Sequence, residues 1–234
     1  MRLVLVVAAE RRELVGILRI LGKRAKVQLP IDFAEEGERE SSRFLLIANG
    51  AGPSLAGKAV DAASQHRAFD AIVSTGFCGG LDPSLQVGDI VVADRVDAVE
   101  QNAAYPALAP SCAAGYRRGV VVSQDKIAQT IEEKRQLRAR GAAAVEMEAA
   151  AVAERANRAG LPFFCVRVVS DTADQGFLFD LNTMRDADGR FQTSRILGAA
   201  LASPMRLVPQ LFRLQQQSSL AARNLGDFFA DCRF

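Results

Sequence analysis

The sequence predicts an α/β fold in which strands and helices alternate along the chain. Several short apolar runs are rich in Val, Leu and Ile, which is typical of strands buried on both faces of a sheet. Segments with helical spacing lie between these runs, and glycine-rich or acidic clusters follow three of them. At 234 residues the chain is long enough for one such domain, so we expect a single domain over residues 1–234.

The first third of the chain gives the clearest alternation. Residues 3–9 are an unbroken Val- and Leu-rich run, which predicts a buried strand. Residues 13–21 place apolar side chains at helical spacing and end at Gly22, so they predict a helix. Residues 23–43 are polar and fit a hairpin or a loop. The expected elements that follow are a strand over 44–48, a helix over 55–68 and a strand over 70–75.

The remaining elements are less regular. Short apolar runs predict strands at 90–93 and 119–123, and the Ala-rich stretch between them, 96–118, is expected to be a flexible flap. Residues 129–140 predict a charged helix. An Ala-rich helix is expected to start at 145 and to end near 159, before Gly160 and Pro162. The expected last elements are a strand over 163–169 and a mainly helical tail over about 192–234.

Composition excludes several classes of function. The 29 Lys and Arg residues nearly balance the 27 Asp and Glu residues, which argues against a nucleic-acid partner. His66 is the only histidine, so Ser-His-Asp catalysis and multi-histidine metal sites are disfavoured. No signal peptide or membrane span is expected. The four cysteines, none in C-x-x-C spacing, are expected to be reduced in a cytoplasmic protein: Cys78, Cys112, Cys165 and Cys232.

Three clusters follow predicted strands, where open α/β sheets bind ligands. They are the glycine-rich residues 50–54, the glycine-rich residues 76–80, and the pair Ser170-Asp171. Glycines allow main-chain N–H groups to approach an anion, and a helix start favours negative charge. Each cluster also has a structural interpretation: a capped helix start at 50–54, a close chain crossing at 76–80, and a helix cap at Ser170-Asp171.

Three acids are candidates for chemistry. In an extended segment Glu146 and Glu148 would share one face, whereas in a helix one would face a cleft and the other solvent. The alternative is that both only complement a helix dipole. Asp171 ends an apolar strand, where partial desolvation would suit a general acid.

Four motifs together resemble the nucleoside phosphorylase and methylthioadenosine/S-adenosylhomocysteine nucleosidase family. They are Thr75-Gly-Phe-Cys-Gly-Gly-Leu81, Val87-Gly-Asp-Ile-Val-Val92, Ala144-Val-Glu-Met-Glu-Ala-Ala-Ala151 and Arg167-Val-Val-Ser-Asp171. The resemblance implies a three-layer α/β/α fold around a mixed, partly barrel-like sheet. It also implies cleavage of a purine nucleoside N-glycosidic bond by a homo-oligomer that needs no metal or organic cofactor.

Carried over residue by residue, the resemblance assigns roles to this chain. Glu148 would hold the ribose hydroxyls above Met147, and Asp171 would protonate the purine, while Gly50 and Gly76 would line the phosphate or water side. Phe163, Phe164 and Asp174 are the candidates for contact with the base. These roles suit an oxocarbenium-like transition state, in which a proton donor helps the purine to leave.

Departures from the family pattern concern the nucleophile. In the segment Glu10-Arg-Arg-Glu13, Arg12 (or Arg11) would bind phosphate, which favours phosphorolysis with inorganic phosphate as co-substrate. Glu13 is the alternative, as a base that activates water. Phe77 and Ser74 stand where hexameric phosphorylases have a serine and an arginine for phosphate, and residues 124–127 replace a base-stacking phenylalanine.

The C-terminal part resembles the hopanoid-associated phosphorylase branch, through Asp125-Lys126, Glu133-Lys134 and residues 186–190. That resemblance implies a lipid-linked adenosine, such as adenosylhopane, as the substrate. The apolar and basic tail then has two interpretations: a helix in transient contact with a membrane surface, or a helix packed on the domain or a partner subunit. A nucleoside-binding module without turnover is the rival from another class.

Overall fold

The computed structural model describes residues 1–178, 180–186, 190, 192 and 204–234. Its sheet contains β1 (Arg2–Ala8), β2 (Gly22–Lys26), β3 (Phe33–Arg39), β4 (Ser42–Ala48), β5 (Ala71–Gly80), β6 (Ile90–Ala98), β7 (Ala103–Pro106), β9 (Arg117–Ser123), β10 (Ala142–Glu146) and β11 (Phe163–Asp171). Its helices are η1 (Arg11–Leu14), α1 (Val15–Ile20), α2 (Pro53–His66), α3 (Ile131–Ala139), α4 (Ala149–Arg158), η2 (Asn182–Met184) and α6 (Pro204–Asp231). Two short strands, β8 (Ser111–Cys112) and β12 (Cys232–Arg233), pair separately.

The central sheet is mixed and closes on itself at one end. Its strand order is β10-β9-β6-β11-β5-β1-β4-β3-β2, and β10 also pairs with β5. This extra pairing closes β5, β11, β6, β9 and β10 into a barrel-like ring. Strand β5 runs parallel to β1 and β11, whereas β6 pairs antiparallel with β11. The predicted mixed, partly barrel-like sheet is confirmed.

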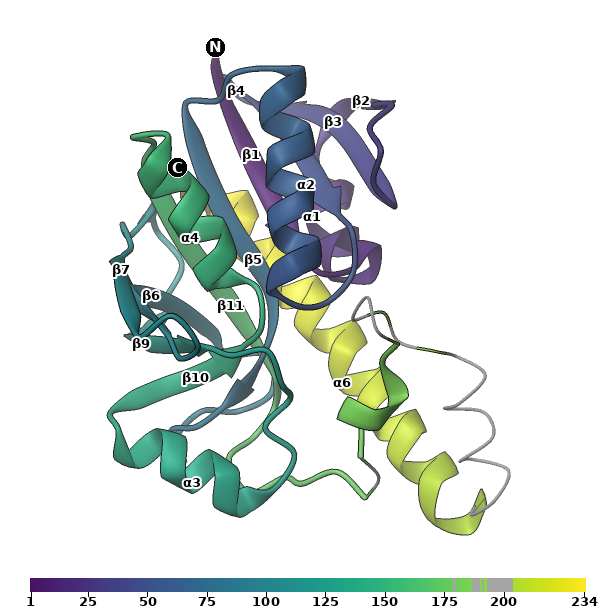
Figure 1. The fold of residues 1–234 in the computed structure, drawn as a ribbon. Coiled ribbons are helices and arrows are strands. Elements are labelled where there is room, and N and C mark those ends of the chain that lie inside the picture. Colours follow the sequence, from purple (N-terminus) through teal and green to yellow (C-terminus); the bar gives the residue numbers. More distant parts are fainter. Residues whose placement is uncertain (179, 187–189, 191, 193–203) are drawn as a thin grey trace.

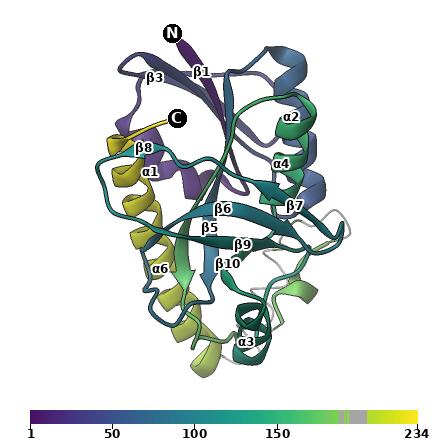
Figure 2. The same cartoon turned by 90° about the vertical axis from the view of Figure 1, so that its left-hand side faces the viewer.

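Helices cover both faces of the open part of the sheet (Figures 1 and 2), with α2 and α4 on one side and α1 and α6 on the other. Alternation along β1 divides the core accordingly: Leu5 and Val7 pack in the cluster that holds α2 and α4, while Val4 and Val6 pack in the cluster with α1 and α6. The three-layer α/β/α architecture is therefore confirmed.

Two predicted boundaries were wrong at the closure of the barrel. The glycine cluster 76–80 is not a turn after a strand but the second half of β5, where Gly79 and Gly80 pair with β10. This fits the alternative interpretation as a close chain crossing, since small residues let the strands approach. Residues 142–146 form strand β10, and the helix expected from 145 begins only at Ala149.

The expected flap over residues 96–118 was also wrong. Strand β6 continues to Ala98, β7 pairs antiparallel with it, and β8 pairs with β12 at the other end of the chain. Main-chain pairing, rather than a strong apolar pattern, gives this segment its structure. The polar segment 23–43 does contain the expected hairpin, formed by β2 and β3.

The expectation that all four cysteines are reduced was wrong for two of them. Cys112 and Cys232 form a disulfide between β8 and β12, with a Cα–Cα distance of 4.3 Å. Cys78 and Cys165 are free and buried. The two cysteines are 120 residues apart, so their local spacing in the sequence could not predict the disulfide.

Helix α6 provides the described part of the predicted helical tail; the tail residues 193–203 lie outside the described part of the chain. Its C-terminal half packs on the sheet through buried residues that include Leu225 and Phe228, while Val208 and Phe212 are exposed near its start. In the described residues, no helix has the length and apolar character needed to cross a membrane.

Candidate active site

Candidate side chains from four separate segments of the chain meet in a cavity of about 670 Å³. Glu13 enters from η1, Phe77 from β5, and Asp171 from the end of β11. Met147 and Glu148 come from the junction of β10 and α4. The motif residues that the sequence analysis singled out as acids therefore share one cavity, although up to 158 positions separate them.

Glu13 is fixed by main-chain donors. Its Oε2 accepts hydrogen bonds from the N–H groups of Ala9 and Glu10, at 2.8 and 3.0 Å, and its Oε1 accepts one from Phe77 N–H at 2.9 Å. Burial raises the pKa of this carboxyl, while the hydrogen bonds from Phe77 and Glu10 oppose the shift. A held carboxylate with an elevated pKa has the properties of a general base.

Gly76 makes room for that carboxylate. It has a φ of +129°, and a Cβ at this position would lie 2.9 Å from the Glu13 carboxyl atoms. A residue other than glycine would therefore be strained and would press on Glu13.

Glu146 and Glu148 are both buried, but they have different partners. Glu146 forms an ion pair with the fully buried Arg167 and accepts hydrogen bonds from the N–H groups of Glu148 and Ala149, at 2.9 and 2.8 Å. It therefore caps the start of α4, which matches the helix-dipole interpretation. The alternative in which one of the two acids faces solvent required both to lie in a helix, but α4 begins only at Ala149 and both acids are buried.

Glu148 points into the cavity. Its Oε1 accepts a hydrogen bond from Gly52 N–H at 2.8 Å, in the glycine-rich turn after β4. Burial and then the negative charge of Glu146 raise the pKa of Glu148 to about 8, and the Arg167 charge acts against this shift. A buried carboxyl with spare acceptor capacity suits a ligand that brings hydroxyl groups.

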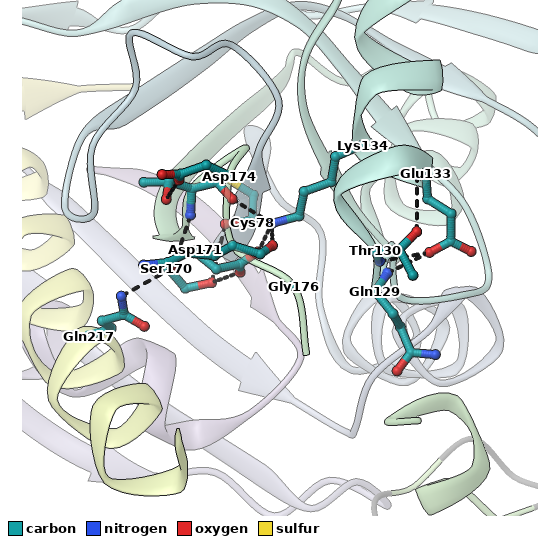
Figure 3. A network of polar contacts seen from close by, with 12 residues as sticks. Cys78, Gln129, Thr130, Glu133, Lys134, Ser170, Asp171, Asp174, Gly176 and Gln217 are labelled. Atoms are coloured by element: carbon teal, nitrogen blue, oxygen red, sulfur yellow. Dashed lines mark hydrogen bonds and ion pairs between the residues drawn. The ribbon is translucent and has the colours of Figure 1, made fainter. Parts of the chain in front are cut away.

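Asp171 occupies the opposite end of the acid cluster and contacts a lysine that the sequence analysis did not place in the site. Its Oδ1 accepts a hydrogen bond from Ser170 Oγ at 2.8 Å, and its Oδ2 lies 2.5 Å from Lys134 Nζ (Figure 3). Lys134 is 1% exposed. Asp171 nevertheless lines the cavity, so it can reach a ligand.

The rest of the cavity wall is largely apolar. It comes from the segment after β9, the chain after β11, and helix α6: Ile127, Ala128, Phe177, Leu181, Leu211 and Leu214. Phe177 is the aromatic side chain on this side of the cavity. This wall suits an aromatic base and an apolar substituent on the ligand.

The remaining candidates for the phosphate or water side lie at the rim. Arg12 lines the cavity, but its Nε pairs with Glu10 Oε2 at 2.7 Å and its side chain is 59% exposed. Gly50 lines a smaller adjoining hollow of about 250 Å³ rather than the main cavity.

The three candidates for the base lie elsewhere. Phe163 and Phe164 are buried in the two core clusters, and Phe164 stacks edge-to-face on Phe234 with ring centroids 5.4 Å apart. Asp174 is exposed and accepts a hydrogen bond from Thr172 Oγ1. Both Phe side chains lie at the start of β11 and pack into the hydrophobic core on its two faces, whereas only the end of the strand reaches the cavity.

The sequence analysis named Lys134 and the segment 124–127 for their resemblances, but it placed none of Lys134, Ile127 and Phe177 in the site. Lys134 had one signal: it lies three positions before the buried Leu137, on the inward face of α3. Phe177 and Ile127 lie in irregular segments, where no period shows which side chains face inward. In the described part of the chain, no group of three or more His, Cys, Asp and Glu side chains is arranged to hold a metal ion.

Comparisons with known proteins identify the family and support the fold. The family model of the phosphorylase superfamily matches residues 34–201. A solved methylthioadenosine/S-adenosylhomocysteine nucleosidase from Neisseria meningitidis, in complex with methylthio-immucillin-A, is 21% identical with a TM-score of 0.70, covering 98% of this chain and 99% of that one. The Streptococcus pyogenes S-adenosylhomocysteine nucleosidase, in complex with 5-methylthiotubericidin, is 23% identical with a TM-score of 0.64, covering 96% and 97%. A futalosine hydrolase mutant of Helicobacter pylori is 17% identical with a TM-score of 0.66, covering 98% and 99%.

Proposed function

Because this chain belongs to the phosphorylase superfamily, we propose that it is an enzyme that cleaves the N-glycosidic bond of an adenine nucleoside. One observation carries the proposal: Glu13, Glu148 and Asp171 line one cavity from three different parts of the chain. Binding alone would not require an acid at each side of the bond to be broken. This arrangement therefore favours turnover over a module that only binds nucleosides.

The ribose and the purine fit different ends of the cavity. Glu148 accepts hydrogen bonds from the ribose hydroxyls, and Met147 packs beneath the sugar. Asp171 passes a proton to a ring nitrogen of the purine while the bond between the sugar and the base breaks. The electron pair of that bond stays with the purine, and the sugar passes through an oxocarbenium-like state. The residues present need no metal or organic cofactor for these steps.

We propose that water, rather than phosphate, attacks the sugar. Glu13 lies on this side with a raised pKa, and Glu146 and Glu148 are close by, so the region holds more acids than cations. The Arg167 charge is already paired with Glu146. When Glu13 is the carboxylate that accepts its three main-chain hydrogen bonds, it disfavours a phosphate dianion by like-charge repulsion. Glu13 would take one proton from the water as its oxygen bonds to the sugar.

Phosphorolysis is the second candidate, because Arg12 and Lys126 line the same cavity. Release of adenine from adenosine, with and without inorganic phosphate, separates the two reactions. Hydrolysis predicts the same rate in both and ribose as the product. Phosphorolysis predicts a rate that rises with phosphate and yields a sugar phosphate.

The apolar wall supports an apolar 5′ substituent on the substrate, which is consistent with a lipid-linked adenosine such as adenosylhopane. We propose that the start of α6, with Val208 and Phe212 exposed, makes transient contact with a membrane surface to reach such a substrate. The test compares adenine release from adenosine, methylthioadenosine and a 5′-alkyl adenosine, and liposome flotation of the wild type with that of a Val208→Ser/Phe212→Ser variant. Equal rates for the three nucleosides, together with equal flotation of the two proteins, would contradict the proposal of a lipid-linked substrate reached at a membrane. A homo-oligomer and a cytoplasmic location stay predictions.

A further inference from the structure

The amino group of Lys134 uses all three of its donors within one small region. It lies 2.5 Å from Asp171 Oδ2, 2.7 Å from the carbonyl oxygen of Thr172 and 3.0 Å from that of Gln175. Figure 3 shows the side chain reaching from α3 to the end of β11. A buried ammonium with three fixed acceptors cannot turn away from Asp171 without losing hydrogen bonds.

The helix that carries Lys134 is itself anchored. Thr130 Oγ1 accepts a hydrogen bond from Glu133 N–H, and the Glu133 carboxylate accepts one from Thr130 N–H, which makes a capping box. The carbonyl oxygen of Gln129 accepts a hydrogen bond from Phe177 N–H. Lys134 and the start of α3 therefore hold the loop after Asp171, and this loop brings Phe177 to the cavity wall.

We infer that Lys134 is a positioning residue for Asp171: it fixes the carboxyl group in the cavity and supplies the positive charge that stabilises the carboxylate left after proton transfer. This inference rests on the proposed function of Asp171. When Asp171 gives its proton to the purine, a negative charge forms 2.5 Å from the ammonium.

Other groups around the two residues set the background for this effect. Ser170 donates to Asp171, the Cys78 thiol of β5 interacts with it electrostatically, and Asp174 interacts with the Lys134 charge. The other titratable groups of the cavity wall are Glu10, Arg12, Glu13, Lys126, Glu146 and Glu148. Substitution of Lys134 leaves all of them in place, so a change in kcat can be assigned to the pair.

The test measures kcat and KM for adenine release by the wild type and by Lys134→Met, Lys134→Gln and Lys134→Arg. In the Met and Gln variants we expect kcat to fall at least about tenfold, with KM within about threefold. Lys134→Arg keeps the positive charge, so we expect it to recover most of the wild-type kcat.

A matched control is Arg138→Met, which removes a cation one turn further along α3. Arg138 pairs with Asp82 at 2.7 Å and does not line the cavity, so the kcat and KM of this variant should match the wild type. If Lys134→Met does not fold, the comparison of Lys134→Gln with Lys134→Arg decides. A kcat of Lys134→Gln equal to that of the wild type, or a kcat of Lys134→Arg as low as that of Lys134→Gln, would overturn the inference. A wild type that releases no adenine from any nucleoside would instead overturn the proposed function.

Discussion

Arg167 forms its ion pair with Glu146 and not with Glu148, although both acids are buried and only two residues apart. Glu146 is further held by two main-chain N–H groups at the start of α4. Glu148 has no cationic partner in an ion pair: it accepts main-chain hydrogen bonds from Gly52 at 2.8 Å and Met147 at 3.3 Å, and it faces the cavity with a pKa of about 8. The ion pair therefore gives the two acids different roles: Glu146 stabilises the structure of the site, and Glu148 is open to a ligand.

This difference makes stability depend on pH through Glu148. In the folded protein it keeps its proton up to about pH 8, whereas in the unfolded chain it loses it near 4.5. Between these values the folded state binds more protons, so the free energy of unfolding falls as pH rises, by at most about 1.4 kcal/mol per pH unit. Urea unfolding of Glu148→Gln between pH 5 and 8 should show a smaller fall than the wild type. Glu154→Gln, on the partly exposed side of α4, is the control and should keep the wild-type slope; equal slopes for all three proteins would contradict the assignment.

Substitutions of Glu13 and Arg12 distinguish the two reactions, because hydrolysis depends on Glu13 and phosphorolysis depends on its neighbour Arg12. If Glu13 activates water, Glu13→Gln should lower kcat by about 10²–10⁴-fold, since the base is lost but the shape is kept. Arg12→Gln should change kcat/KM by less than about threefold, because Arg12 is exposed and paired with Glu10. Steady-state adenine release gives both values. The reverse order, with a dependence on phosphate lost in Arg12→Gln, would favour phosphorolysis.

Asp171→Asn should remove the proton donor while leaving the cavity almost unchanged in shape. We expect kcat to fall by about 10²–10⁴-fold and the affinity for adenosine, measured by calorimetry, to change by only a few-fold. Asp94→Asn on β6 removes an acid that is exposed and paired with Arg118, outside the cavity, and should act as wild type. Activity of Asp171→Asn within a few-fold of wild type would rule out the proton-donor role.

The disulfide between Cys112 and Cys232 should stabilise the attachment of the chain end. It closes a segment of 120 residues, so its loss should lower the free energy of unfolding by about 2–5 kcal/mol. A reductant should therefore lower the melting temperature of the wild type but not that of a Cys112→Ser/Cys232→Ser variant. The buried free Cys78 and Cys165 are present in both proteins and serve as the internal control. An unchanged melting temperature for the wild type would show that the bond adds no stability.

Most of the strand and helix pattern was predictable because the buried strands are long apolar runs. Residues 3–8, 44–48 and 163–169 all belong to observed strands, and in these three runs only Arg167 interrupts the apolar pattern. The failures lie where pairing partners decide the structure. Strand β10 and the second half of β5 are rich in small Ala and Gly residues, and they form strands through pairing, β10 with both β5 and β9.

The residues of the candidate site likewise fall into those that the sequence predicted and those that it did not. Glu13, Glu148 and Asp171 carry recognisable local motifs, and the structure brings them together. No motif placed Lys134 or Phe177 in the site, because their positions follow from how α3 and the loop after β11 pack in three dimensions. Phe164 was assigned to the base, but strand alternation directs it into the core.

Gly76 is the position where a single methyl group should separate backbone strain from site geometry. Gly76 and Gly141 both have positive φ, of +129° and +87°, so an alanine at either costs about 1–2 kcal/mol of stability. Only at Gly76 would the new Cβ meet the Glu13 carboxyl group, at 2.9 Å, whereas at Gly141 nothing lies within 4 Å. Gly76→Ala should therefore lower kcat at least about tenfold through displacement of the base, and Gly141→Ala should keep wild-type kcat despite a similar loss of stability. Equal kcat values in the two variants, with stabilities measured in parallel by urea unfolding, would show that the fit between Gly76 and Glu13 is not required for the reaction.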